Sequence, residues 1–514
     1  MTHQPMTTQL ASTGHIMDGI PYWMGMAGLA IIIVSSHLLV HFRSRQKEKT
    51  SYRRFNLFRF TPLKKLIKRP WFPLLVQSLS LTIFLFVIAA GLLGHDKNNI
   101  GPILTWTWWW ILLIFLTLGF GKAFCMICPW EAMSSIMTSL SFKSRIKVLG
   151  YEKPWPKWAR NIFPAIGFFI ILTWFELGHD ITRSASLTAI LGLAMAGMAV
   201  FSAIVFEKRS FCRYGCLVGR ISGLYAMFSP LELRADSADV CATCKTKECY
   251  VGTSTTTPCP TFLFPSKMEE STYCTLCTEC IRSCPHDNIT INYRAPATDL
   301  LKRKKFKWDE ATLAIVLLAL TSFHGLTMTP HWTNWINTLR ADTGFGQTTV
   351  FTIFMALMLL LPILLFWIGA TAARKLAGDN SIDTASIFKA FAYSLIPIAL
   401  FYHLAHNCMH FFMEGQIIIP RLSDPLGWGW NLFGTAGKTY PPFLSLTTIW
   451  WLQVICVVVG HLYGVVLADR YARTLFKNKR AVFLGLIPLL ITMILYSAFS
   501  MWLIMQPMDM RSGM

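Results

Sequence analysis

The stretch FTIFMALMLLLPILLFWI, residues 351–368, decides the kind of fold that this chain adopts. It contains no charged residue, and its length approaches the ~20 residues that a helix needs to cross the hydrocarbon core of a membrane. Similar apolar runs recur along the chain, for example at 162–177 and 313–326. The sequence therefore predicts an all-α helical membrane bundle.

The composition of the whole chain supports this fold class. Of the 514 residues, 54% are hydrophobic and only 14% are charged, against roughly 25% charged residues in ordinary soluble domains. The net charge of +21 would suit nucleic-acid binding. However, the basic residues lie in short loops between apolar runs, which is the pattern of the positive-inside rule. We therefore expect contact with membrane lipid and no nucleic-acid partner.

The apolar runs predict ten membrane-spanning helices in two blocks of five. The predicted spans are 22–42, 72–94, 102–121, 161–178, 185–206, 310–329, 348–371, 386–409, 445–468 and 482–504. The loop 43–69 holds eleven Lys and Arg residues, which places it in the cytoplasm and both chain termini outside. The polar leader before the first run has no basic region, and the run is therefore interpreted as a retained helix. The expected location is a bacterial inner (cytoplasmic) membrane.

A polar insert, residues 207–307, separates the first membrane block (1–206) from the second (308–514). It is rich in Cys, Thr, Ser and Pro and too poor in Leu, Ile and Val to build a large core. A domain of this size usually needs a staple such as a metal. The charge rule places it in the reducing cytoplasm, where disulfides are rare. Metal ligation is therefore the better interpretation of its cysteines.

The strongest motif is CTLCTECIRSCP, residues 274–285. In this C-x2-C-x2-C-x3-C-P spacing, three thiolates hold three corners of an iron–sulfur cubane and the fourth reaches a second cluster. A zinc knuckle is the alternative interpretation, but zinc is usually held by two separated pairs of ligands. The spacing therefore favours iron–sulfur clusters.

A partner motif lies just upstream, with Cys241-x2-Cys244-x4-Cys249 followed by Cys259-Pro260. Together the motifs predict two [4Fe-4S] clusters. One is expected on Cys241, Cys244, Cys249 and Cys284, and the other on Cys259, Cys274, Cys277 and Cys280. Over residues 241–285 the chain resembles two-cluster bacterial ferredoxins, which implies a small inserted α+β domain that holds both clusters.

Four further thiols stand at predicted helix ends, as Cys125 and Cys128 after the third helix and Cys212 and Cys216 after the fifth. Both helices should run from outside to inside, so the two pairs emerge on the same face and could converge. Neighbouring Lys and Arg side chains would favour thiolates. A third cluster, bound copper, a redox-active dithiol site and free buried thiols are the interpretations left open.

This arrangement resembles the NapH/NosR/CcoG-type membrane polyferredoxins, which are associated with periplasmic nitrate reductase, nitrous oxide reductase and cytochrome oxidase assembly. In that family, two Cys-x3-Cys-Pro motifs at helix ends flank a segment that leads into a two-cluster ferredoxin domain. Here Leu217 replaces the second Pro, and the Cys125–Cys128 spacing is one residue shorter. The resemblance covers residues 70–300 and leaves the last five helices outside it. It implies a role in electron transfer.

Several histidines lie inside the predicted membrane helices, where they are costly and usually functional. The candidates are His37, His324, His403, His406, His410 and His461. The three on the predicted eighth helix follow i, i+3 and i+7 and share one face. The one on the sixth helix should lie at a similar outer depth, and the remaining two nearer the cytoplasm. Haem b ligation, a quinone or metal site, and structural hydrogen bonding between helices are the three interpretations left open.

These features predict a membrane-bound iron–sulfur electron-transfer protein of a respiratory chain. It would relay electrons between a membrane donor, either the quinone pool or a membrane dehydrogenase, and another redox protein. No side chain is expected to act as a nucleophile or general acid, because the cofactors carry the chemistry. The main alternative is an assembly factor that reduces a metal ion or a disulfide for a partner metalloenzyme. A redox-sensing regulator ranks last, because no sensor or DNA-binding domain is recognisable.

Overall fold

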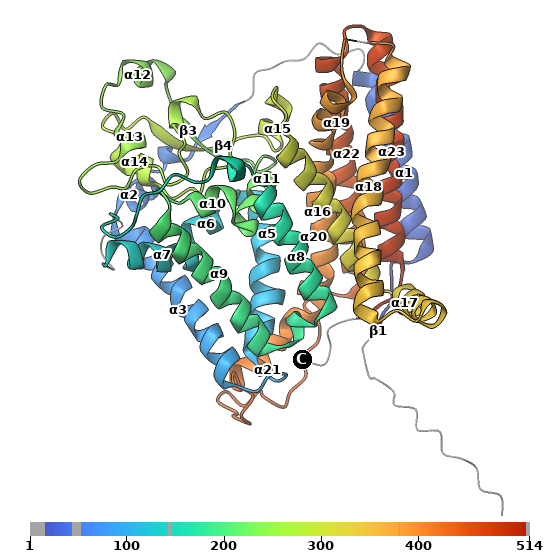
Figure 1. The fold of residues 1–514 in the computed structure, drawn as a ribbon, viewed down its shortest axis with the longest axis horizontal. Helices are drawn as coiled ribbons and strands as arrows, with labels where there is room; N and C mark the ends of the chain where they lie inside the picture. Colours follow the sequence, from blue (N-terminus) through green and yellow to red (C-terminus); the bar gives the residue numbers. More distant parts are fainter. Residues whose placement is uncertain (1–15, 44–52, 142–145, 380, 510–514) are drawn as a thin grey trace, which may run out of the picture.

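The computed structural model describes residues 16–43, 53–141, 146–379 and 381–509, and it is mostly helical (Figure 1). Within these residues, nine helical segments are long and apolar enough to cross a membrane, which supports a multi-pass membrane protein. They are α1 (Tyr22–Arg43), α3 (Trp71–Leu93), the continuous α4, η2 and α5 (Ile100–Phe120), α9 (Ala185–Val205), α16 (Trp308–Thr327), α18 (Gln347–Ala377), the run from α19 to α21 (Thr384–Ser423), α22 (Leu446–Leu475) and α23 (Lys479–Met505).

The remaining predicted span, 161–178, is a shorter helix than expected. It forms α8 (Phe163–Gly178), whose 16 residues give a length of about 24 Å, less than the ~30 Å hydrocarbon core. The loop before α8 is tied to α16, because the backbone N–H of Ile162 donates to the Asp309 carboxylate (3.0 Å). A proline occupies the first turn of α8. The helix therefore begins later than the apolar run suggests.

The second membrane block forms a tight bundle in which α20 (Leu395–Glu414) packs against α22 and α16, and α18 packs against α23. Helix α1 also joins this bundle, through contacts with α22 and α23. The residues just before α1 pair with the chain after α23, as β1 (Ile16–Met17) and β5 (Met508–Asp509). The first predicted helix therefore packs with the second block, although it lies in the first block along the sequence.

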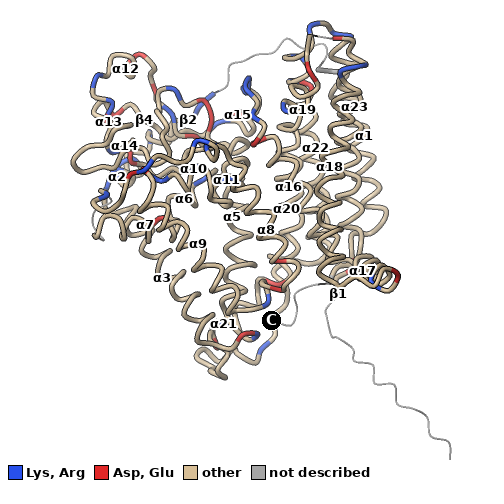
Figure 2. Tube along the Cα trace, viewed as in Figure 1, with Lys and Arg blue, Asp and Glu red and all other residues tan. Residues whose placement is uncertain are grey.

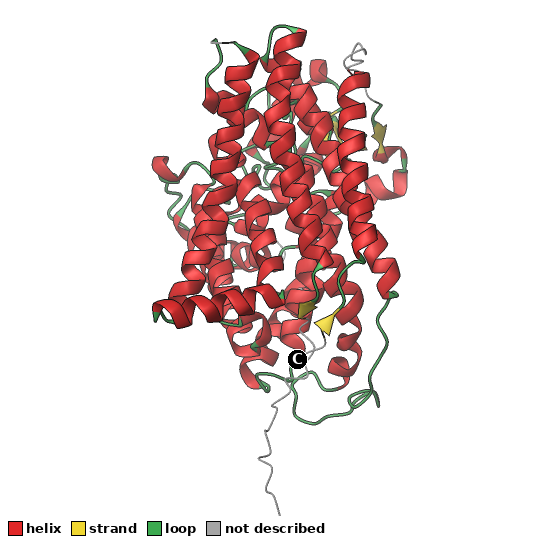
Figure 3. Cartoon of the chain, turned by 90° about the vertical axis from the view of Figure 1, so that its right-hand side faces the viewer, coloured by secondary structure: helices red, strands yellow, loops and turns green. Residues whose placement is uncertain are grey.

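The other helices of the first block, α3, α5 (Trp110–Phe120) and α9, stand beside this bundle (Figure 1). They are joined by α7 (Pro129–Ser139), which packs against α3 and α9. Figure 3 shows the long helices running side by side, with loops gathered at the two ends of the molecule. Helix α17 (Pro330–Thr343), absent from the sequence prediction, lies across one end of the bundle (Figure 1).

The insert 207–307, here called the cysteine-bearing segment, projects at one end of the bundle and is built around a three-stranded antiparallel sheet. Its strand order is β2 (Phe55–Asn56), β4 (Ile289–Tyr293) and β3 (Leu231–Ala235). A small core under the sheet combines residues of β3, β4 and α14 (Glu279–Ser283) with Phe58 and Ile67. The loop 53–69 is therefore structurally part of the cysteine-bearing segment, which the sequence prediction did not anticipate.

Four short helices of this segment carry one cysteine each: α10 (Ser210–Tyr214), α12 (Ala238–Thr243), α13 (Glu248–Val251) and α14. Between α10 and β3, helix α11 (Leu217–Tyr225) is buried along its whole length and packs against α5, α8, α16 and α20. Figure 2 shows Lys and Arg gathered around α12, α13 and α15 (Thr298–Lys302) and at the neighbouring helix ends. The cysteine-bearing end is therefore the more basic end of the molecule.

Candidate functional site

The cysteines of the two ferredoxin-like motifs line two separate cavities. Cys241, Cys244, Cys249 and Cys284 line the first, together with Asn288. The second is lined by the other four, which are Cys259, Cys274, Cys277 and Cys280. In each case a cysteine from one motif joins three cysteines of the other, as in the sets predicted from spacing. All eight cysteines are partly buried and none forms a disulfide.

Among the described residues, no three thiols of one set have their sulfur atoms all within 4.8 Å of one another. In the described residues, only a histidine group brings three potential ligand atoms within 4.8 Å of one another. Sulfur ligands of a tetrahedral zinc site, with bonds of about 2.3 Å, would lie only ~3.8 Å apart. As they stand, the thiols of each set are therefore more widely spaced than the ligands of a mononuclear zinc site.

Donors of the protein point at the sulfur atoms of both cavities. The Asn288 side chain donates to Cys241 Sγ (3.2 Å) and its backbone N–H to Cys284 Sγ (3.4 Å). In the second cavity the Leu263 backbone N–H donates to Cys259 Sγ (3.3 Å). Such hydrogen bonds stabilise negative charge on sulfur and tune the potential of any cluster that the thiolates hold.

The four helix-end thiols converge around a third cavity. Cys125, Cys128, Cys212 and Cys216 line it together with Glu131. Cys125 lies in α6 (Ala123–Ile127) and Cys128 is the residue before α7, whereas Cys212 lies in α10 and Cys216 is the residue before α11. The chain breaks its helix at each pair, which turns the thiols towards a common centre.

Buried charges surround this third cavity. Lys122 and Arg220 are each almost completely buried, and Arg220 Nη2 donates to the carbonyl oxygen of Cys212 (3.2 Å). On another side, Arg209 Nε donates to Glu131 Oε1 (2.8 Å). Burial removes the hydration of these cations. The free-energy cost of that loss is offset only where negative charge lies nearby. A set of thiolates holding a metal cluster would supply such charge.

Burial changes the chemistry of the free thiols in the third cavity. Desolvation raises the pKa of Cys128, Cys212 and Cys216 above the ordinary value. Without a metal these thiols would thus be neutral at pH 7, although the sequence had suggested that neighbouring basic residues would make them thiolates. In contrast, backbone and side-chain donors lower the pKa of Cys244, which belongs to the first motif set.

The three cysteine-lined cavities are neighbours. Pro260 and Cys277 line both the third cavity and the cavity of the second motif set. Helix α14 carries Cys280, and Cys284 follows its last residue, so the two motif sets are linked by one helical turn, about 6 Å along the helix axis. The cysteines therefore form a continuous series from the end of α5 to α12.

A large apolar cavity of about 500 Å³ adjoins this series inside the first membrane block. Trp106, Trp108 and Trp109, which belong to a π-helical stretch (Ile103–Trp109), line it. Phe124 and Trp130 line both this cavity and the third cysteine cavity. The volume lies within the ~300–1,000 Å³ that small-molecule sites occupy. This cavity could not be predicted from the sequence, because its lining comes from eight separate elements.

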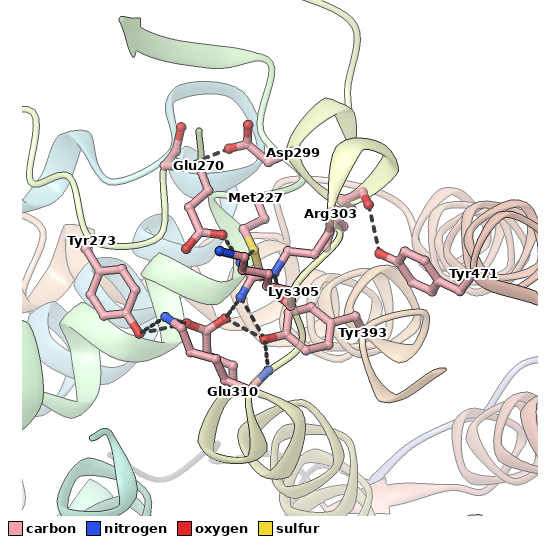
Figure 4. Close-up of polar contacts among 12 residues, drawn as sticks. Met227, Glu270, Tyr273, Asp299, Arg303, Lys305, Glu310, Tyr393 and Tyr471 are labelled. Carbon is pink, nitrogen blue, oxygen red and sulfur yellow. Dashed lines mark hydrogen bonds and ion pairs between the residues drawn. The ribbon is translucent and has the colours of Figure 1, made fainter. Parts of the chain in front are cut away.

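A buried polar network joins the cysteine-bearing segment to the second block (Figure 4). Its centre is Glu310 of α16, which is fully buried. Tyr273 Oη (2.7 Å), Tyr393 Oη (2.6 Å) and Arg303 Nη2 (2.7 Å) all donate to its carboxylate. Because Tyr273 immediately precedes Cys274, the network fixes one end of the second cysteine set against the membrane bundle.

Three of the predicted histidines come together near the far end of α16 and α20. His324, His406 and His410 place one ring nitrogen each within 4.8 Å of the others. The rings of His324 and His406 have centroids 4.9 Å apart, and those of His406 and His410 are 5.1 Å apart. These three residues therefore form a compact group that could hold a metal ion.

The other predicted histidines have different surroundings. His403 lies 3.3 Å from Tyr225 Oη, with its ring 6.0 Å from that of Trp110. Both ring nitrogens of His461 are engaged by hydroxyls, of Ser36 (3.0 Å) and Ser497 (2.8 Å). His37 is exposed on α1. The structure thus brings three of the six candidates into one group and leaves the other three apart.

Sequence reasoning included Lys122 among the basic neighbours of the helix-end thiols, but it missed three other charged residues that support these sites: Glu131, Arg220 and Glu310. The available signal was their position: each lies within a few residues of a cysteine motif or at the start of an apolar helix. A charge at such a place is ambiguous, because basic and acidic residues at helix ends are usually solvated and can also reflect topology.

Comparison with known proteins gives one distant match. No protein-family model matches the chain, and no solved structure matches it significantly. A protein of Escherichia coli K12 described as "Putative electron transport protein YccM" is 22% identical over 240 residues. The match covers 41% of this chain and 61% of the E. coli protein. The chain therefore spans less than two thirds of the length of the relative that it matches.

Proposed function

We propose that the chain is a membrane-bound iron–sulfur protein that transfers electrons between a lipid-soluble donor and a redox partner protein. The observation that carries the proposal is the series of adjoining cavities, from the apolar cavity through the helix-end thiols to the two motif sets. The distant relative, described as an electron transport protein, supports the same class of function. The NapH/NosR/CcoG-type resemblance remains part of this proposal.

In this proposal each motif set holds one [4Fe-4S] cluster, and the four helix-end thiols hold a third. A cluster supplies one-electron chemistry with little rearrangement of its thiolate cage. The wide spacing of the thiols favours a cluster over copper bound by three or four of them. The protein would contribute the N–H donors to sulfur and the buried Lys122 and Arg220, which stabilise the added negative charge.

The apolar cavity is the proposed entry point for electrons. Its lining lies among membrane helices and is shared at one end with the third cysteine cavity. A quinol is the membrane-soluble carrier whose ring and tail suit an apolar, tryptophan-lined site. Oxidation of a quinol releases two electrons and two protons, so a one-electron carrier next to the cavity would accept the electrons one at a time.

Electrons would leave the protein from the first motif set, which is furthest along the series of cavities from the apolar cavity. Its cavity lies in the segment that projects from the bundle (Figure 1). By the positive-inside rule, the Lys and Arg residues around it (Figure 2) support a cytoplasmic location for this end, and they would favour an acidic surface on the partner protein. Assignment to a bacterial inner membrane rests on the same argument.

Metal and sulfide analysis of anaerobically purified protein tests the cofactors. Three cubanes require about twelve Fe and twelve acid-labile sulfides per chain, because each holds four of both. The variant Cys216→Ser should lose about four of each and retain the other eight. Stoichiometric zinc without sulfide would overturn the proposal. A count of eight Fe per chain in both proteins would contradict the third cluster and leave the other two in the proposal.

A cavity-filling variant tests the donor site. Leu172 lines the apolar cavity, whereas its neighbour Ile171 does not line it and is exposed. We expect Leu172→Trp to slow reduction of the clusters by a soluble quinol by about tenfold or more, a change of at least 1.4 kcal/mol. Reduction by dithionite should be unchanged, and Ile171→Trp should behave like the unmodified protein. Equal rates in all three proteins would exclude this cavity as the donor site.

A further inference from the structure

We propose that His324, His406 and His410 form a second, independent metal site, which binds one divalent first-row transition-metal ion. The three side chains offer one ring nitrogen each within a 4.8 Å span. They come from α16 and α20, which pack directly against each other. No residue of this group belongs to the cysteine-lined cavities, so the inference does not rest on the iron–sulfur proposal.

The arrangement on the helices suits metal ligation. His406 and His410 lie four positions apart on α20 (i and i+4), so both imidazoles project from one face, as in helical zinc-binding motifs. His324 approaches from α16 and completes three corners of a ligand set. Bonds from nitrogen to zinc are about 2.0–2.1 Å, so small side-chain rotations would bring the three nitrogens onto one ion.

A carboxylate orients one of the three ligands. His410 Nδ1 and Glu414 Oε2 are 3.0 Å apart, and both side chains are buried. This contact leaves His410 Nε2 for the centre of the group, and that nitrogen is buried without a hydrogen-bond partner among the described residues. A carboxylate contact of this kind, behind a ligating imidazole, fixes the ring and raises its basicity.

The burial of the group also favours a bound ion. His406 and His410 are each only 2% exposed, within a helix that would cross the membrane. A buried nitrogen without a hydrogen-bond partner, such as His410 Nε2, costs roughly 1–3 kcal/mol of stability. Coordination of that nitrogen to a metal would remove the cost. His324 is only half-buried, which gives the side from which an ion or a fourth ligand could approach.

The ligand set distinguishes this site from the cysteine sites in chemistry and in place. Imidazole nitrogens suit Zn²⁺, Cu²⁺, Ni²⁺ and Fe²⁺, and three protein ligands leave an open position for water or a substrate. His324 lies fourteen residues beyond Glu310 along α16, about 21 Å along the helix axis. Haem ligation is disfavoured, because axial imidazoles approach from opposite sides of a macrocycle, whereas these three converge.

The test is a metal titration of the full-length protein in detergent. After treatment with a chelator, Co²⁺ is added as the probe, bound metal is counted, and X-ray absorption identifies the ligand atoms. We expect about one Co²⁺ per chain, held by nitrogen and oxygen. Binding through sulfur, or no binding above the level of the variant with all three histidines changed to Ala, would overturn the proposal.

Single substitutions add the matched controls. His410→Ala should reduce Co²⁺ affinity by at least a hundredfold, and Glu414→Gln by about 10–100-fold through loss of the orienting contact. His403→Ala, on the same helix but next to Tyr225, should leave the affinity unchanged. The thermal midpoint in detergent reports correct folding of each variant. Equal Co²⁺ affinity in the His403, His410 and Glu414 variants would contradict the site.

Discussion

The cysteine-lined cavities and the histidine group are built by opposite means within one chain. The thiols of each motif set come mainly from short, closely spaced runs of sequence, on loops and helices of four to six residues. The three histidines come from two long helices, α16 and α20, and meet only because those helices pack. Local spacing therefore makes the first kind of site, and helix packing makes the second.

The two regions also differ in how deeply their helices are buried. In the apolar 18-residue stretch of α16, 83% of the residues are buried, and the corresponding share for the α19–α21 run is 72%. For α3 the share is only 28%. Helices around the apolar cavity thus expose much of their surface to lipid, which suits entry of a lipid-soluble molecule. The histidine group instead lies in the most densely covered part of the bundle, which suits a fixed ligand set.

The sharpest test of this comparison is to remove one ligand from each region. Cys280→Ser should lose its cluster and so reduce the iron content by about four per chain. The Co²⁺ affinity of the histidine group should be unchanged. Conversely, His406→Ala should abolish Co²⁺ binding and leave iron and sulfide at the level of the unmodified protein. Loss of both metals in both variants would show that the two regions are not independent sites.

A second prediction concerns the network that joins the two regions. Glu310→Gln removes the charge that faces Arg303 and Lys307 and leaves Glu270 as the remaining acidic partner of buried Arg303 among the described residues. Breaking a buried ion pair in this way costs about 3–5 kcal/mol, so the thermal midpoint in detergent should fall markedly. Lys307→Gln is the control, because Lys307 is about half exposed and should contribute only ~0–1 kcal/mol.

A smaller effect is expected from the close contact between α11 and the second motif set. A Cβ added at Gly223 would stand 2.3 Å from the carbonyl oxygen of Thr272, two residues before Cys274. Gly223→Ala should therefore cost about 1–3 kcal/mol through overpacking and disturb the cluster spectrum. Gly197→Ala is the matched control, because a Cβ there meets nothing within 4 Å. Equal stability of the two variants would argue against a rigid contact.

The smallest expected effect separates a structural histidine from the ligating group. The Ser497 hydroxyl and His461 Nδ1 form a hydrogen bond in the membrane bundle. Ser497→Ala should lower the free energy of unfolding by about 1 kcal/mol, the usual contribution of one hydrogen bond. It should change neither iron content nor Co²⁺ affinity, as measured by the same metal analyses. A loss of bound metal would instead assign His461 to a metal site.

Much of the architecture could be predicted from the sequence. Runs such as 351–368 predict membrane helices, because hydrocarbon offers the backbone no hydrogen-bonding partner and only a helix satisfies it locally. The cysteine spacing of 274–285 likewise constrains its chemistry, since neighbouring thiols on a short loop must share a centre. In contrast, the span predicted at 161–178 is a helix of only 16 residues, because hydropathy does not define where the chain is tied to α16.

Packing decided the rest. Spacing along α20 put His403, His406 and His410 on one face, but only the position of α16 and α11 separates His403 from the other two. The apolar cavity, the pairing of α1 with α22 and α23, and the contacts of Glu310 depend on residues far apart in the sequence. The sequence by itself determined the membrane helices and the cysteine sets, because both follow from local spacing. Which distant side chains meet was decided only by the tertiary structure, because helix packing sets those distances.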